Sequence, residues 1–390
     1  MRLLRLELLP PSVVGCHMPR RPSRNLMRAL ILFLSLLAPL LTSCGEEEDS
    51  RVWLKGDLHL HSDHSHDARD NPLSALVPLA ESLGMDYFVI TDHDNHVNGK
   101  LTTWDDPHYR SDAMVLLYGV EWTTGRGHAN FFGAERFEHE RLYALRESSG
   151  EQVAEEAARQ SLHFSINHPI GKDLWEYGFD HHFDSIEIWN ALFLAPNRNR
   201  DAIALWESLV MEQGRRIPIR GGSDCHHQEG GEAEIFNIGN PTTWVYARDR
   251  SGEAVLNALG RGNASISYAP TAERLELWAD ADGDGKYELL MGDTIESVPE
   301  SLAFDLRVEG THPGDSYRVL IIKDGETLLE ETVRAVQPRL TLTFRDSPNG
   351  RTFYRAELRA EPPLRHLQTT LPEAYGDMIA LTNPIYVGYP

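Results

Sequence analysis

Histidines and carboxylates gather in one stretch of this sequence. Fifteen of the 18 histidines fall between His59 and His227, and only His312 and His366 follow that stretch. Imidazole and carboxylate groups are the ligands with which proteins hold zinc, manganese and iron. The distribution therefore predicts a metal centre built from this part of the chain.

The first motif is His59-Leu60-His61, at the end of a run over residues 52–60 that reads as a strand. Residues i and i+2 of a strand point to the same face, so both imidazoles can bind one cation. Such a pair alone is a weak signal, but a loop rich in further donors follows it. That loop contains Asp63, His64, His66 and Asp67.

Further motifs stand at the ends of β-type runs, which is where α/β folds place their sites. Glu121 follows an apolar run and is suited to bridge two metals, while Asp224 and His226 repeat the i, i+2 spacing. Together with the first motif, this series predicts a metal centre. The motifs are Asp92-His93-Asp94, Glu121, His128, Asn167-His168 and Asp224-Cys225-His226.

The elements that must position these motifs follow from apolar periodicity. Their β-then-α order predicts an α/β domain with parallel strands, either a barrel or a doubly wound sheet. The run 217–222 is interpreted as the last clear strand of this domain. Strands are expected at 52–60, 87–91, 114–121, 163–167, 185–189 and 217–222, and helices at 72–83, 151–161 and 201–213.

After about Pro270 the pattern changes to short strands separated by Gly, Pro and Asp turns, which is typical of an all-β sandwich. We therefore expect a metal-binding domain over 52–270 and a β-sandwich domain over 271–390. The expected strands of the second domain are 275–279, 302–309, 317–323, 327–333, 340–344 and 354–361.

One acidic loop stands out in the second domain. Asp280, Asp282 and Asp284, followed by Gly, match the first half of a calcium-binding loop, and Glu288 adds a carboxylate. Position 12 of the pattern is Met291 instead of the bidentate Glu, and no helices are expected beside the loop. Both a calcium site and a solvated acidic turn fit these residues.

The N-terminal segment is expected to be a targeting sequence and not a part of the folded domain. Arg20, Arg21, Arg24 and Arg28 lie just before the apolar run 29–41, which is short for a bilayer span and suits a signal peptide. The run ends in Leu41-Thr42-Ser43-Cys44, which looks like a bacterial lipobox. The mature protein is then a membrane-anchored lipoprotein on the periplasmic side, and Gly45 favours the outer membrane. The expected segments are a signal peptide over 1–43 with Met27 as the true start, lipidation at Cys44, and an acidic tether over 44–51.

Net charge narrows the class of partner. The 390 residues include 37 basic and 59 acidic side chains, for a formal net charge of −22. A surface this acidic repels a phosphate backbone, so general DNA or RNA binding is excluded. A small anion at a metal centre is compatible with it, because the metals supply local positive charge. A small-molecule substrate is therefore expected.

Together these motifs resemble the PHP superfamily, named for polymerase and histidinol phosphatase domains. The resemblance rests on His59-Leu60-His61, Thr91-Asp92-His93, Glu121, Asn167-His168-Pro169 and Asp224-Cys225-His226. The lipobox, Gly127-His128-Ala129-Asn130 and Thr382-Asn383-Pro384-Ile385 look more like its CehA/McbA-type metallohydrolase branch. The family fold is a distorted (β/α)7 barrel, so the expected architecture is a PHP-type barrel followed by a small Ig-like sandwich.

The resemblance also implies which residues hold two or three divalent metals, with Zn, Mn and Fe equally suited to such ligands. The loop ligand of the third metal is left open between Asp67, which the family spacing favours, and His64 or His66. Carried over by position, His59, His61, Glu121 and Asp224 hold one metal, Glu121, His128 and His168 a second, and Asp67, His93 and His226 a third.

Clustered divalent metals lower the pKa of a shared water and give hydroxide near neutral pH. Such a hydroxide can attack phosphorus or an acyl carbon. The PHP resemblance makes phosphoester hydrolysis the expected reaction, with Asp224, Glu121 and His226 as catalytic residues. Amide, ester or carbamate hydrolysis on the same site is one alternative, and a non-catalytic, metal-stabilised surface binding lipoprotein is another. Supporting or substrate-contacting candidates are Asp57, Asp92, Glu187, Asn190 and Arg198, with Arg220 as a further partner for phosphate oxygens.

Overall fold

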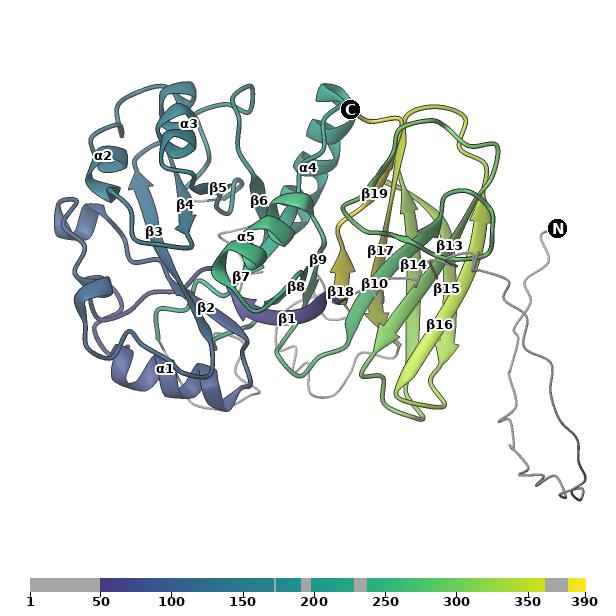
Figure 1. Cartoon of the computed structure of the whole chain (residues 1–390), viewed down its shortest axis with the longest axis horizontal. Helices are drawn as coiled ribbons and strands as arrows, with labels where there is room; N and C mark the ends of the chain where they lie inside the picture. Colours follow the sequence, from purple (N-terminus) through teal and green to yellow (C-terminus); the bar gives the residue numbers. More distant parts are fainter. Residues whose placement is uncertain (1–49, 172, 191–197, 228–236, 362–377) are drawn as a thin grey trace, which may run out of the picture. The chain divides into compact units, whose positions relative to one another are not determined.

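The computed structural model describes residues 50–171, 173–190, 198–227, 237–361 and 378–390. The expected signal peptide, the lipobox with Cys44 and most of the tether lie outside these residues. Within them, no helix has the length and apolar character needed to cross a membrane. Residues 51–390 form one unit of mixed α/β structure, with more strand than helix (Figure 1).

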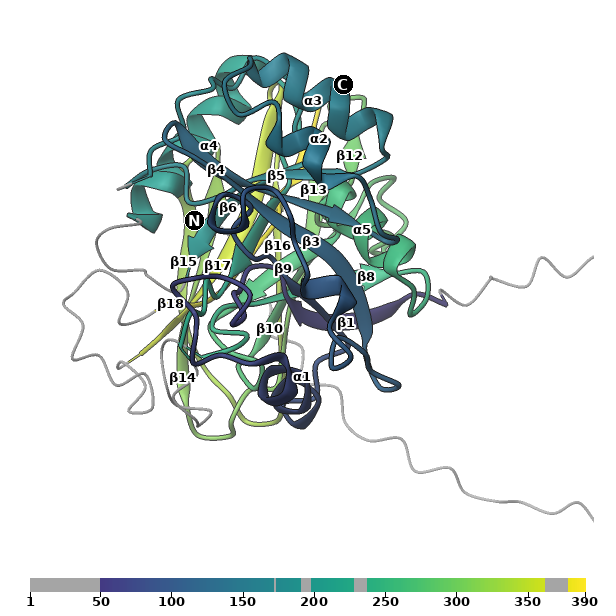
Figure 2. The same cartoon turned by 90° about the vertical axis from the view of Figure 1, so that its left-hand side faces the viewer.

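The region before residue 270 combines strands and helices. Helices α2 and α3 lie together near one end of β3 and β4, whereas α1 lies toward the other end (Figures 1 and 2). The strands are β1 (Val52–Asp57), β2 (Tyr87–Ile90), β3 (Val115–Thr124), β4 (Gly127–Gly133), β5 (His163–Ile166), β6 (Ser185–Asn190), β7 (Ile219–Gly222), β8 (Thr242–Ala247) and β9 (Ala264–Ser267). The helices are α1 (Leu73–Ser82), α2 (His139–Tyr143), α3 (Gly150–Arg159), α4 (Asn199–Gln213) and α5 (Gly252–Arg261), with single 3-10 turns η1 (Asn95–Val97) and η2 (Thr103–Asp105).

Strands β1 to β7 follow one another in sheet order, and β8 lies on the free side of β1. Beyond the ends of β1 and β7, Leu60 and Cys225 form a parallel bridge. This bridge brings the first and last strands of the series together at the end where the motifs lie. The connection matters for the site, because it joins the loops that carry the earliest and latest motifs.

The six strands expected up to residue 222 run in the same direction, but β4 between β3 and β5 was not expected and runs against them. Pairs β1–β2, β2–β3, β5–β6 and β6–β7 are parallel, but β4 is antiparallel to both β3 and β5. Only Gly125 and Arg126 separate β3 from β4, and a turn this short permits only an antiparallel hairpin. The run 217–222 is also not the last strand, because β8 and β9 follow it.

Helix α1 shows how these elements are held on the sheet. Its apolar residues recur at helical spacing and place Leu73, Leu76, Val77 and Ala80 on the buried face. They pack in one cluster with Phe88 and Ile90 of β2. Replacing such a leucine by alanine typically costs about 2–5 kcal/mol of the free energy of unfolding.

After residue 270 the described chain is β-structure. Strands β11, β10, β13 and β16 form a four-stranded sheet, and the other strands extend the first sheet through the β9–β18 pair. Residues of both sheets share one apolar core that includes Leu277, Val319 and Ala356. The strands are β10 (Arg274–Asp280), β11 (Leu289–Leu290), β12 (Thr294–Ile295), β13 (Leu302–Glu309), β14 (Ser316–Lys323), β15 (Glu326–Arg334), β16 (Arg339–Asp346), β17 (Thr352–Ala360), β18 (Met378–Thr382) and β19 (Ile385–Val387).

The expected boundary between 270 and 271 falls between β9 and β10, while the β9–β18 ladder crosses it. The mixed α/β character is confirmed. The (β/α)7 barrel, the Ig-like topology and the domain bounds stay predictions.

Asn383 ties the end of the described chain to the strands before residue 270. Its buried Oδ1 accepts the N–H of Ile219 at 2.8 Å, and its Nδ2 donates to the carbonyls of Ile219 and Ala264, both at 2.9 Å. The Tyr386 hydroxyl accepts the N–H of Ile217 at 3.2 Å. These contacts anchor the start of β7, the strand that leads to Asp224.

Candidate metal centre

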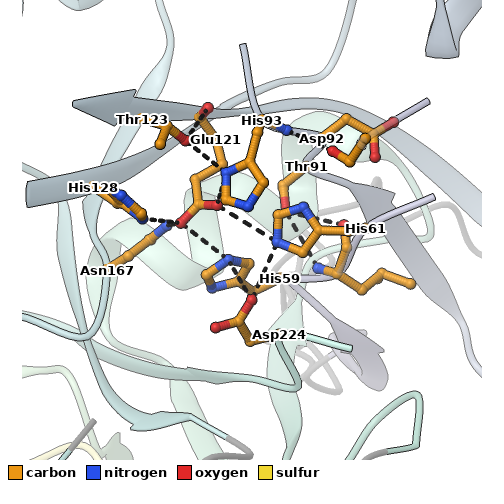
Figure 3. Close-up of polar contacts among 12 residues, drawn as sticks. His59, His61, Thr91, Asp92, His93, Glu121, Thr123, His128, Asn167 and Asp224 are labelled. Carbon is orange, nitrogen blue, oxygen red and sulfur yellow. Dashed lines mark hydrogen bonds and ion pairs between the residues drawn. The ribbon is translucent and has the colours of Figure 1, made fainter. Parts of the chain in front are cut away.

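The expected ligands meet at one end of the first sheet. His59 and His61 follow β1, His93 follows β2, Glu121 lies in β3, and the remaining members come from β4, from the segments after β5 and β7, and from one loop. Figure 3 shows several of these side chains converging on Glu121. The side chains brought together are His59, His61, Asp67, His93, Glu121, His128, His168, Asp224 and His226.

Glu121 is the hub of the cluster. Its side chain is 1% exposed, and its ion pairs within the described residues are all with histidines. The two carboxylate oxygens face different imidazoles, which is the arrangement of a bridging ligand (Figure 3). Oε1 lies 3.3 Å from His59 Nε2, 3.2 Å from His128 Nδ1 and 3.4 Å from His168 Nε2, while Oε2 lies 3.5 Å from His61 Nε2 and 2.7 Å from His93 Nδ1.

Asp224 lies opposite Glu121 and shares two of its histidines. Its Oδ1 is 3.4 Å from His59 Nε2 and 3.1 Å from His61 Nε2. The expected strand spacing of Asp224 and His226 is wrong, because β7 ends at Gly222 and Asp224 has a left-handed φ of 50°. His168 also has a positive φ, of 21°. Strained backbone at non-glycine residues is stored preferentially at functional sites.

Asp67 supplies the loop carboxylate next to His93 and His226. Its Oδ2 lies 3.4 Å from both His93 Nε2 and His226 Nε2. His64 is directed elsewhere, with Nδ1 2.7 Å from Thr102 Oγ1 and Nε2 3.3 Å from Asp106 Oδ2. The structure therefore places Asp67, and not His64, beside His93 and His226.

Hydrogen bonds on the far sides of two imidazoles aim their other nitrogens into the cluster. His59 Nδ1 donates to Glu187 Oε1 at 2.9 Å, and His226 Nδ1 donates to the Asp224 carbonyl at 2.8 Å. Metal-bound histidines usually donate their second N–H in this way. Within the described residues, His59 Nε2 and Glu121 Oε2 are buried without a hydrogen-bond partner.

These residues fit divalent metal ions. A tetrahedral ion with bonds near 2.0–2.1 Å separates its donor atoms by about 3.3 Å. The separations given above between the ligand imidazoles and the carboxylate oxygens of Glu121, Asp224 and Asp67, apart from the 2.7 Å contact of His93 with Glu121, lie between 3.1 and 3.5 Å. A buried polar atom without a partner costs about 1–3 kcal/mol, and a cation between the donors removes that cost.

The pKa values show which positive charges a metal ion would replace in the cluster. Burial alone would raise the pKa of Glu121, but the charges of His93 and His59 hold it well below its usual range. Burial likewise would lower the pKa of His93, but Glu121 and Asp67 raise it to about 10. Burial and the nearby His226 and His93 lower the pKa of His61 to about 3. In the metal-free chain the carboxylates are therefore ionised, and protons on some of the histidines balance them.

Arg220 lies beneath the cluster and is fully buried. It donates from Nη1 to Glu187 Oε1 at 2.7 Å and from Nη2 to Asn167 Oδ1 at 2.5 Å. Glu187 in turn holds His59, and Asn167 Nδ2 donates to Glu121 Oε1 at 2.9 Å. The expectation that Arg220 pairs with a substrate phosphate is wrong, because its guanidinium is taken up by residues that orient the ligands.

The remaining candidates divide between the centre and the surface. Asn190 Nδ2 donates to Asp224 Oδ2 and to Glu187 Oε2, both at 3.1 Å. Asp57 accepts the N–H groups of His59 at 3.1 Å and Ser223 at 3.0 Å, so it joins two ligand-bearing segments. Arg198 is exposed and pairs with Asp201 at the start of α4.

Asp92 supports the first loop and not the ring of His93. Its carboxylate accepts the N–H and the hydroxyl of Ser62, both at 2.7 Å. The His93 ring instead contacts Thr123 Oγ1 at 2.6 Å and Glu121. Sequence reasoning missed Thr123, whose only signal is its position two residues after Glu121 on the same face of β3.

The acidic loop after β10 is closed by its own hydrogen bonds. Asp280 accepts the N–H groups of Gly283 at 2.6 Å and Gly285 at 3.0 Å. Asp282 accepts the N–H of Asp284 at 3.0 Å, and Glu288 accepts that of Ala281 at 2.9 Å. An acidic turn and a calcium loop both make such bonds, so calcium binding stays a prediction.

A cavity of about 720 Å³ lies at the opposite ends of β5 and β6. His163 begins β5 and lines this cavity, whereas His168 follows the other end of the strand. The cavity is therefore not the substrate pocket of the metal cluster. Its polar lining includes Arg136, Gln160, His163, Asp184, Asn257 and Arg261.

Comparison with solved structures gives a likeness that is only distant. No protein-family model matches the sequence, and no curated protein matches it. Among solved structures, the chain is similar to a two-domain protein from Bacteroides vulgatus that contains a predicted PHP-like metal-dependent phosphoesterase. The identity is 17%, the TM-score is 0.39, and the match covers 79% of this chain and 91% of that one. At this level of similarity, the likeness assigns neither an activity nor a ligand to this chain.

Proposed function

We propose that this chain is a metal-dependent hydrolase that cleaves phosphoesters at a centre of two or three divalent metals. The observation that carries the proposal is the geometry of Glu121. This buried carboxylate presents its two oxygens to separate imidazoles, at distances that suit a shared metal ligand. The residues on which the PHP resemblance rests in the sequence lie together in this cluster.

Bound divalent metals would activate water as a nucleophile and neutralise charge that develops on a substrate oxygen. The chain's own residues hold and orient the groups around that chemistry. Arg220 fixes Glu187 and Asn167, which fix His59 and Glu121. Asp224 accepts a hydrogen bond from Asn190 on Oδ2 and faces His61 with Oδ1, so its carboxylate is held in the cluster.

The phosphoester class is supported by the PHP resemblance of the ligand motifs. Within the described residues, the cluster's one buried arginine is committed to orienting ligands. An anionic substrate therefore has to rely on the metals for positive charge, which is the condition under which a multinuclear centre is needed.

Elemental mass spectrometry of the purified protein tests the centre. We expect two or three transition metals per chain and turnover of aryl phosphomonoesters or phosphodiesters. Glu121→Gln should lower that turnover by more than about 100-fold and reduce the metal content, because outer support alone is worth 10–100-fold. Glu357→Gln, which changes an equally buried carboxylate away from the cluster, is the matched control.

Different results would change the assignment. Turnover of aryl carbamates, amides or carboxylic esters without any phosphoester turnover would favour the alternative hydrolase. Full metal content without turnover of any of these substrates would favour a metal-stabilised binding protein. A protein that takes up no transition metal, even after reloading, would contradict the proposal as a whole.

The architecture and location proposed with this function rest on the sequence. They are a PHP-type (β/α)7 barrel over 52–270, an Ig-like domain over 271–390, and export as a lipoprotein anchored at Cys44. Globomycin, which blocks lipoprotein signal processing, should cause an unprocessed precursor to accumulate. Unchanged processing and membrane association in its presence would contradict the lipid anchor.

A further inference from the structure

His66 and His96 lie next to the centre, on its solvent side. His96, in η1, has its ring centroid 4.5 Å from that of His93. The ring of His66 is nearly parallel to that of His96, with 5.3 Å between centroids and 5° between planes. The His96 side chain is 25% exposed and that of Asp67 43%, so water reaches this group directly.

Asp67 divides its two oxygens between the inner cluster and His96. Its Oδ2 faces His93 Nε2 and His226 Nε2, at 3.4 Å each. Its Oδ1 lies 3.5 Å from His96 Nδ1. Because different oxygens face the two sets of imidazoles, Asp67 can bind one ion on each side.

No hydrogen bond joins His96 Nδ1 and Asp67 Oδ1, because neither atom carries a hydrogen. His96 Nδ1 accepts the backbone N–H of His66 at 3.3 Å, so it carries a lone pair and no hydrogen. That lone pair faces the Oδ1 of Asp67, which is also an acceptor. Two acceptors this close repel each other, and a cation between them turns the repulsion into ligation. The exposed N–H of His66 would then bond to water.

We propose that His96 and Asp67, which lie beside His66, form an outer site for a divalent transition metal at the rim of the centre, separate from the inner ions. The site rests on the proposed metal centre, because it shares Asp67 with the third inner metal. Zinc-class ions are the fitting ligand, since imidazole with one carboxylate suits them better than calcium or magnesium. Its exposure makes it the position that exchanges fastest with solvent.

Zinc binding at buffered free concentrations tests the site. The purified protein is equilibrated over a range of free zinc, and bound zinc is counted by elemental analysis. The wild-type chain should bind one more zinc at high free concentration than the inner centre holds, and His96→Gln should lose this last equivalent alone. His108→Gln, which changes an exposed histidine outside the group, should bind as the wild type does.

A second variant guards against an unfolded His96→Gln protein. Asp67→Asn should lose the outer zinc and one inner zinc together, because Asp67 faces both. The outer site is contradicted if His96→Gln binds as many equivalents as the wild type, or only weakens an inner one. A wild type that binds no zinc would contradict the whole metal centre, which is a different failure from the loss of the outer site alone.

Discussion

Glu121 and Glu357 are both buried carboxylates, but they are neutralised in different ways. Glu357 accepts hydrogen bonds from Arg355 Nη1 at 2.7 Å and from Arg359 Nη2 at 2.6 Å. Glu121 has histidines as its partners in ion pairs throughout the described chain. A guanidinium is always charged, whereas an imidazole is charged only when it holds a proton.

Glu357 therefore has its balancing charge within the chain at every ordinary pH, whereas Glu121 depends on bound protons or metal ions. After residue 270, Glu357 has permanent cations beside it, so its charge is balanced at neutral pH. The cluster around Glu121 must take positive charge from protons or from metal ions. Metal binding to such a site releases protons and couples the free energy of unfolding to metal supply.

Removing the metals should produce the largest effect. With a chelator, hydrolysis should fall by more than about 1000-fold, because the activated water is lost. Loss of an ion present at 1000 times its dissociation constant costs about 4 kcal/mol, or about 8 °C in Tm for a chain of this size. Calorimetry with and without chelator measures the shift, and zinc or manganese should reverse it. An unchanged Tm and activity would remove the distinction between the two regions.

Replacing the buried arginines by lysine should have the next largest effect and should show whether the two regions use their arginines differently. Arg220→Lys cannot reach Ser165, Glu187 and Asn167 together, so metal affinity should fall about 10–100-fold. Excess metal should restore most of its kcat. Free zinc at half-loading is the quantity to measure.

Arg355→Lys is the matched variant after residue 270. Arg355 is 3% exposed and binds both Glu207 and Glu357. Weakening this buried pair should lower the free energy of unfolding by about 3 kcal/mol, with no change in metal content. If Arg220→Lys lost stability but kept wild-type metal affinity, Arg220 would be a structural residue like Arg355.

His163 offers a smaller, pH-dependent effect. It is buried against Ser185, and burial lowers its pKa to about 4, whereas the pKa of His93 beside two carboxylates rises to about 10. The unfolded chain binds a proton near pH 6.5 and the folded chain does not until pH 4. Stability is therefore lost as pH falls from 6.5 to 4, by about 3 kcal/mol.

Denaturant unfolding at several pH values measures this loss. His163→Gln should flatten the curve over that interval, because glutamine does not titrate. An equal slope in both proteins would show that other groups carry the pH dependence.

The smallest expected effect could break the comparison. If the loop with Asp280, Asp282 and Asp284 binds calcium with the weak affinity of extracellular modules, 1 mM calcium should stabilise the protein by about 1 kcal/mol. Asp284→Asn should abolish the gain. The region after residue 270 would then also use an external cation. Titration calorimetry without heat would leave the loop as an acidic turn.

Sequence patterns predicted several strands of both regions to within one residue. The expected run 302–309 is strand β13 (Leu302–Glu309), and 317–323 differs from β14 by one residue. Alternating apolar residues decide such strands, because one face is buried against the facing sheet. Strands β8 and β9 were missed since their Thr- and Ser-rich sequences lack a long apolar run.

The residues of the candidate centre could be named from the sequence, but their geometry could not. Asp224 is not a glycine, and its left-handed backbone is imposed by its N–H bond to the His59 carbonyl at 2.6 Å, 165 residues away in the chain. The role of Arg220 depends in the same way on partners from other strands. His96 had one signal, its place three residues after His93, where a 3-10 turn brings both rings to one side.

The clamp of Asn383 on Ile219 implies an order of events during synthesis. These residues are 164 positions apart, so β7 gains its final support only after almost all of the described chain has left the ribosome. Contacts this distant in sequence form late, because a long loop must close first. An ion that binds the candidate centre would then be chosen where folding ends and not where translation occurs. If the chain is exported, the metals available outside the cytoplasm would decide which ion occupies the centre.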